Sequence, residues 1–353
     1  MPVERLLATR AQRAFILTIT IQAIVVLTMV AITFRKVEVK VNFHAPQYKT
    51  LPCYLALFAL AEVFELLMAL DALRLRNIIQ LIGILLFHMA LIVFAAIQIH
   101  QTESALLGGN DCTNHFNLIN CPGPGSLWSS VKPFLIVVPV VIAAAWFLMM
   151  FWIKELYSEF GWAIFHVVGA NPKMKIMYQW YQIMLCLIKF DFFFFVGVTM
   201  QLLIVVLARN SAEFGVTIAA IPVVLVLLAL CATAVQREIK WLMTVSLVMM
   251  LAASSYLYKL VRIYEPASRD MYVTTRASLT IFTIVAFILL FATFAVGLRC
   301  FADFDRGLQA SKVNGGSYTP VVTKMELFGG NMSQTQGGAY TGGSALQPRI
   351  SIE

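Results

Sequence analysis

The chain has 353 residues, of which 60% are hydrophobic and only 12% are charged. A soluble globular protein carries about 25% charged residues, so this composition excludes an ordinary soluble domain and indicates a membrane protein. The formal net charge of +8 does not indicate nucleic-acid binding, because Lys and Arg gather between apolar blocks, where anionic lipid headgroups and the positive-inside bias explain them.

Eight apolar blocks follow one another along the chain, each about as long as a helix that crosses ~30 Å of hydrocarbon. Membrane strands of about 10 residues would not leave such blocks. The first block is longer than the apolar part of a signal peptide and lacks a cleavage site, so we expect it to be retained. We predict an all-α, polytopic bundle of about eight spans, with seven as the alternative. The predicted spans are 14–34, 51–70, 77–99, 131–153, 176–207, 213–235, 240–261 and 278–298.

Basic residues between the spans predict an orientation. With eight spans, both termini lie on one side of the membrane, and that side holds 15 Lys and Arg residues against 10 on the other. The positive-inside bias therefore favours cytosolic termini. The predicted organisation is a cytosolic N-terminus over 1–13, a bundle over 14–298 and a disordered cytosolic tail over 299–353. The bundle includes a lumenal loop over 100–130 and a cytosolic connector over 154–177.

Two cysteines flank a polar stretch, DCTNHFNLINC, in the predicted lumenal loop. Cys112 and Cys121 are therefore predicted to form a disulfide, because this side faces an oxidising compartment. Cys300 follows the last span, where a cysteine is a candidate for palmitoylation. In the connector, Leu156 and Phe160 have helical spacing. A short helix on the cytosolic face is expected there, either as an ordered connector or as a partner-binding helix.

Ionisable side chains inside the predicted spans are the natural candidates for function, because they are costly in hydrocarbon. Glu62 and Glu65 are three residues apart on one helical face. Glu62 and His88 each lie about 16 Å from a span end, near the midplane, so they could meet. Lys189 and Asp191 are two residues apart, in KFDFFFF, and point to different faces. A pair of Lys189 with Glu62 or Glu65 would neutralise both charges.

Three interpretations of this candidate intramembrane polar site stay open. It could be a buried polar network that fixes helix packing, a small-solute or proton- or ion-coupled transport site, or a ligand site in a receptor-like bundle. We see no inverted repeat, which counts against a transporter. No catalytic motif is present, so no enzyme is predicted. No cofactor or metal is predicted either, because His44, His100 and His115 fit no known ligand spacing.

Several segments resemble one family. They are TRAQRAFILTITIQAIVVL, AEVFELLMALDALRLRNIIQL, LYSEFGWAIFHVVGANPKMKIMYQWYQIMLCLIKFDFFFFVG, RIYEP and LLFATFAVGLRCFADFDRGL. Over roughly residues 10–310 the chain is similar to the fungal Golgi apparatus membrane proteins, an uncharacterised family of multi-span proteins. The resemblance implies a multi-span protein of the Golgi or a related secretory membrane, with the lipid bilayer as its surroundings. It supplies no catalytic residues and no protein partner or ligand.

Overall fold

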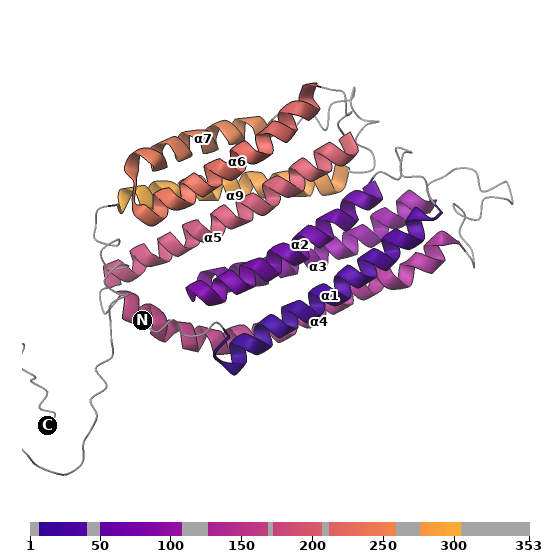
Figure 1. Cartoon of the computed structure of the whole chain (residues 1–353), viewed down its shortest axis with the longest axis horizontal. Coiled ribbons are helices and arrows are strands. Elements are labelled where there is room, and N and C mark those ends of the chain that lie inside the picture. Colours follow the sequence, from indigo (N-terminus) through magenta and orange to yellow (C-terminus); the bar gives the residue numbers. More distant parts are fainter. Residues whose placement is uncertain are drawn as a thin grey trace, which may run out of the picture. The chain divides into compact units, whose positions relative to one another are not determined.

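The computed structural model of the chain describes residues 7–40, 50–107, 126–168, 172–206, 212–258 and 276–304 (Figure 1). The chain divides into two compact units, Met1–Tyr318 and Thr319–Glu353, and every described residue belongs to the first. Within these ranges the regular structure is helical, which confirms the predicted all-α bundle. The helices are α1 (Arg10–Glu38), α2 (Thr50–Leu75), α3 (Ile78–Leu107), α4 (Leu127–Val168), α5 (Pro172–Gln201), α6 (Ala212–Arg237), α7 (Lys240–Tyr258) and α9 (Arg276–Ala302), and a π-helix, η2 (Leu202–Val206), continues α5.

Seven helices in the described part of the chain are long and apolar enough to cross a membrane, namely α1 to α6 and α9. They make the chain a multi-pass membrane protein, and seven is the alternative number that the sequence left open. The apolar part of α7 whose side chains are described, Lys240–Ser254, is shorter than a typical span. The predicted eighth span over 240–261 therefore stays a prediction.

The direction of α9 bears on that eighth span. At one end of α9 the Cys300 thiol donates to the Trp180 carbonyl over 3.6 Å, and at the other the Ser278 hydroxyl lies 3.2 Å from Gln201 Oε1. α9 is therefore antiparallel to α5. Because α6 ends near Cys300 and α9 begins near Gln201, the chain passes from one end of the C-terminal helices to the other between them, and α7 is the described helix on that path.

The helices pack as two groups of four. α1 contacts α2 and α4, and α3 contacts the same two helices, so α1 to α4 form a ring in chain order. α5 and α7 likewise each contact α6 and α9. We call α1 to α4 the N-terminal bundle, drawn in indigo to magenta in Figure 1, and α5, η2, α6, α7 and α9 the C-terminal bundle. The two bundles meet mainly where α2 and α3 pack against α5 and η2.

Aromatic rings fill the contact between the bundles. The Phe193 ring of α5 lies 4.9 Å from Phe64 of α2 and 4.8 Å from Phe87 of α3, measured between ring centroids. Phe94 of α3 meets Phe282 of α9 at 5.5 Å. All five rings are buried. The KFDFFFF segment thus supplies packing between the bundles, and rings at these distances are favourable.

The ends of α3 and α4 differ from the prediction. α3 continues to Leu107 and α4 begins at Leu127, so the predicted loop over 100–130 is partly helical. α4 then runs for 42 residues to Val168 without the predicted break at residue 154. The reason is a packing partner that the sequence does not reveal, because Leu156 and Phe160 are buried in the same core as Phe15 of α1. The expected separate helix in the connector was therefore wrong, and its residues extend α4.

Candidate functional site

A buried chain of polar contacts joins three helices of the N-terminal bundle. His88 of α3 places Nδ1 2.6 Å from Glu65 Oε1 of α2 and Nε2 2.8 Å from the Ile142 carbonyl oxygen of α4. The side chains of Glu65 and His88 are fully buried. The contact holds because Glu65 shares the inward face of α2 with Phe58, Ala61 and Ala69. We call Gln22, Glu62, Glu65, His88 and the Ile142 carbonyl the α1–α4 polar centre.

The chemistry of these atoms fixes the position of one proton and requires the presence of a second. The Ile142 carbonyl can only accept a hydrogen bond, so His88 Nε2 carries a hydrogen and donates it. The contact between Nδ1 and Glu65 Oε1 needs one further proton, since two bare acceptors would repel each other at 2.6 Å. That proton sits either on His88, which gives an ion pair, or on Glu65. In both cases the pair is neutral overall.

Glu62, one turn before Glu65, is bound by a side chain of α1, the fourth helix of this centre. The Gln22 side-chain amide of α1 donates to both carboxyl oxygens of Glu62, over 3.1 and 3.0 Å. Glu62 is fully buried, and Gln22 is 2% exposed. The polar centre therefore takes two groups from α2 and one from each of α1, α3 and α4, and its contacts fix how those four helices sit against one another.

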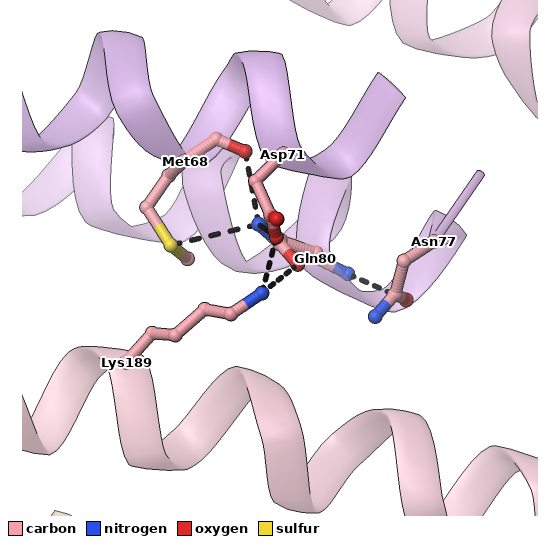
Figure 2. Close-up of polar contacts among 5 residues, drawn as sticks. All are labelled: Met68, Asp71, Asn77, Gln80 and Lys189. Atoms are coloured by element: carbon pink, nitrogen blue, oxygen red, sulfur yellow. Dashed lines mark hydrogen bonds and ion pairs between the residues drawn. The ribbon is translucent and has the colours of Figure 1, made fainter. Parts of the chain in front are cut away.

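Lys189 belongs to a second cluster, at the end of α2 and the start of α3. Its ammonium group, on α5, donates to Asp71 Oδ2 and, over 2.8 Å, to Gln80 Oε1. Gln80 in turn donates to the Met68 carbonyl over 2.9 Å, and its backbone amide is capped by Asn77 Oδ1 over 3.1 Å. Figure 2 shows Lys189 reaching across from its own helix to this group. We call Asp71, Gln80 and Lys189 the Lys189 clamp.

The clamp joins the two bundles, and we expect its charges to be interchangeable. Lys189→Asp places an acid beside Asp71 and should destabilise the protein by about 1 kcal/mol, because the side chains of Lys189 and Asp71 are 28% and 37% exposed and partly screened. The double variant Lys189→Asp with Asp71→Lys should recover part of that loss in thermal unfolding of the purified protein. Lys175→Asp, at an exposed position of the same helix, is the control. Equal loss in both lysine variants, or no recovery, would show that the clamp does not join the bundles.

Asp191 lies in a third place, inside the C-terminal bundle. Its Oδ2 is 2.5 Å from the Thr293 hydroxyl of α9, and that hydroxyl is also 2.9 Å from the Leu289 carbonyl. Asp191 is 6% exposed and Thr293 is fully buried. This contact ties α5 to α9, so each bundle has its own buried polar contact.

The structure thus divides the predicted site. It brings together Glu62, Glu65 and His88, as their depth in the spans predicted. It separates Lys189 and Asp191 from them and from each other, so the proposed pairing of Lys189 with Glu62 or Glu65 was wrong. The reason is that α2 extends to Leu75 and offers Asp71, whose carboxylate accepts a hydrogen bond from Lys189.

Four partners were missed by the sequence reasoning. Asp71 was assigned to a loop, although no Gly or Pro ends the apolar block before it. Gln22, Gln80 and Thr293 are uncharged, whereas the predicted site contains only ionisable side chains. A lone amide within ITIQAIVV is a signal that could have found Gln22, because an uncharged polar group inside hydrocarbon also needs a partner.

The cysteine predictions have different outcomes. Cys112 and Cys121 lie outside the described residues, so their disulfide stays a prediction. Cys300 lies in the last turn of α9, is 5% exposed and packs in the core of the C-terminal bundle. Palmitoylation of Cys300 also stays a prediction, and it would require the thiol to leave this buried position.

Among the described residues, no group of three or more His, Cys, Asp or Glu side chains is placed to hold a metal ion. His100 is exposed on α3, while His44 and His115 lie outside the described residues. The residues of the α1–α4 polar centre bond to one another instead.

Comparison with known proteins identifies a relative. The chain matches no family model and no solved structure. Over 293 residues it is 30% identical to a UPF0658 Golgi apparatus membrane protein of Schizosaccharomyces pombe, and the match covers 78% of this chain and 81% of the relative. The resemblance carried by the quoted segments is thereby confirmed. The chain belongs to the UPF0658 family of Golgi apparatus membrane proteins.

Proposed function

We propose that this chain is an integral protein of the Golgi membrane with a structural or trafficking-related role. The observation that carries the proposal is the Glu65–His88–Ile142 chain of contacts, in which ionisable groups inside the membrane are used to join helices. The Golgi assignment is supported by the name of the relative. In this role the polar residues hold the bundle together, and the activity lies in what the assembled bundle retains or carries in the membrane.

The contact between the bundles also favours this role over transport. Transporters built from parallel repeats bind substrate at the repeat interface, around an axis that relates the two halves. Here α2 and α3, the second and third helices of the N-terminal bundle, face α5, the first helix of the C-terminal bundle. The aromatic side chains of Phe64, Phe87 and Phe193 pack that interface. Non-equivalent helices joined by packed rings suit a fixed assembly.

Cytosolic termini are part of the same proposal. The excess of Lys and Arg on the side of the termini supports it, and so does the antiparallel alignment of α9 with α5, which requires the chain to cross between α6 and α9. With that crossing the number of spans is even. Both ends of the chain then lie on one side of the membrane.

A tagged full-length chain tests the proposal. We expect a fluorescent tag on the tail to coincide with a Golgi marker, and protease added to intact Golgi vesicles to remove it. Removal of the chain from its own cells should redistribute resident Golgi membrane proteins. The variant Met89→Ala, which changes a 44% exposed side chain of α3 outside the polar centre, should restore them as well as the native chain does. Unchanged residents, together with solute uptake by liposomes containing the purified chain, would instead establish a transporter.

A further inference from the structure

The α1–α4 polar centre has more hydrogen-bond acceptors than donors. Both contacts of the Gln22 amide nitrogen go to Glu62, and the hydrogens of His88 serve Glu65 and the Ile142 carbonyl. Two buried oxygens, Gln22 Oε1 and Glu65 Oε2, then have no hydrogen-bond partner among the described residues. Buried polar atoms in folded proteins are nearly always paired. The described protein groups of the centre therefore supply too few hydrogens for its acceptor oxygens.

The centre also lacks positive charge. The Glu65–His88 pair is neutral wherever its shared proton lies, so an ionised Glu62 would give the centre one uncompensated negative charge. The group that binds Glu62 is the uncharged amide of Gln22. A fully buried carboxylate without a cationic partner is costly. One added proton would remove the charge and supply the missing hydrogen.

Charged groups on the neighbouring helices are engaged elsewhere. On α5, Lys189 is bound to Asp71, nine residues further along α2 than Glu62, which is about 13 Å along a helix. Asp191, also on α5, is bound to Thr293 of α9. From α1 and α3 the groups that face Glu62 are Gln22 and His88, and His88 is already bound to Glu65 and Ile142.

We propose that the α1–α4 polar centre is a proton-binding site, in which the Glu62 carboxylate takes up a proton from water and becomes a carboxylic acid. The O–H bond formed is the only covalent change, and the orphaned acceptor oxygens of Gln22 and Glu65 lie in the same centre. A proton suits the site chemically, because it neutralises Glu62 and adds a donor in one step. The proposal is independent of the cellular role, since a structural protein and a transporter can both bind a proton.

Infrared difference spectroscopy of the full-length chain in lipid nanodiscs tests this site. All spectra are taken with Asp191→Asn, because Asp191 is the other buried carboxylate whose described partner is uncharged. A pH step should then produce a carboxylic-acid carbonyl band of a buried group, with an amplitude of one group per molecule. Glu62→Gln, which keeps the shape of the side chain, should abolish that band. Glu155→Gln, which alters an exposed glutamate of α4, should leave it unchanged. Thermal unfolding of each variant verifies that the bundle is intact.

The alternatives give different spectra. If a water molecule or a sodium ion satisfies these oxygens and Glu62 stays ionised throughout the pH step, the chain with Glu62 intact shows no such band, and the proposal is overturned. A band that persists in folded Glu62→Gln would place the proton on another group and overturn it as well. If Glu62→Gln does not fold, Glu62→Asp, which keeps the carboxyl group on a shorter chain, should retain the band at a shifted frequency, and an unshifted band would count against Glu62.

Discussion

Replacement of His88 by alanine should lower the free energy of unfolding by about 3–5 kcal/mol, because removing one partner of a buried pair leaves the other buried and uncompensated. Glu65 Oε1 loses its partner at 2.6 Å, and the Ile142 carbonyl loses its donor at 2.8 Å. The missing imidazole also leaves a cavity between α2, α3 and α4. Unfolding of the purified chain in mixed micelles, followed by far-UV circular dichroism, measures the loss.

The neighbouring residue provides a matched control. Met89 is on the same helix but is 44% exposed and directed away from the core, so Met89→Ala should be close to neutral. The double variant Glu65→Leu with His88→Leu should be more stable than His88→Ala, since replacing a whole buried pair by apolar groups is often tolerated. If His88→Ala and Met89→Ala unfold alike, the contacts of His88 do not hold the bundle together.

Gly197→Ala should destabilise the chain by about 1–3 kcal/mol, which is typical of overpacking a well-filled core. A Cβ at Gly197 would lie 2.7 Å from Phe282 Cε1 and 2.9 Å from Cδ1. The Phe282 ring cannot easily give way, because Phe94 and Phe194 lie against it with centroids 5.5 Å away. The same unfolding assay measures the effect.

The opposite sign is expected at a glycine in open space. Gly215 of α6 has no atom within 4 Å of the position that its Cβ would occupy, other than its own neighbours. Gly215→Ala should therefore stabilise the helix by up to about 1 kcal/mol, through helix propensity alone. Stabilisation of both variants would mean that the contact between α5 and α9 at Phe282 is looser than the ring distances indicate.

The fold class could be predicted because it depends on the local sequence. Blocks of apolar residues of bilayer length specify helices that cross the membrane, whatever lies beside them. The arrangement in two rings of four could not be predicted, since neighbouring helices in a membrane are chosen by side-chain packing and polar contacts between distant residues. Gly83 illustrates this. In the sequence it is a residue of low helix propensity, and only the structure shows that Phe190 and Cys186 of α5 occupy the space that a side chain at this position would need.

The candidate site could be predicted only in part, for a related reason. Depth along a span is a one-dimensional quantity, and it placed Glu62 and His88 at the same level. Depth does not show which side of a helix faces which neighbouring helix. Lys189 therefore seemed able to reach Glu62 or Glu65, whereas the structure gives it Asp71 and Gln80.

The length of α4 has a mechanical consequence. From Val140 to Gly161 the helix contains no proline, so a rotation of its buried part at Met149 is carried without a joint to Glu159, ten residues and about 15 Å away. There Thr9 and Gln12 of α1 hold the Glu159 carboxylate. Because Glu159 binds α1 at this point, we expect a rotation of α4 about its axis to move α1 with it.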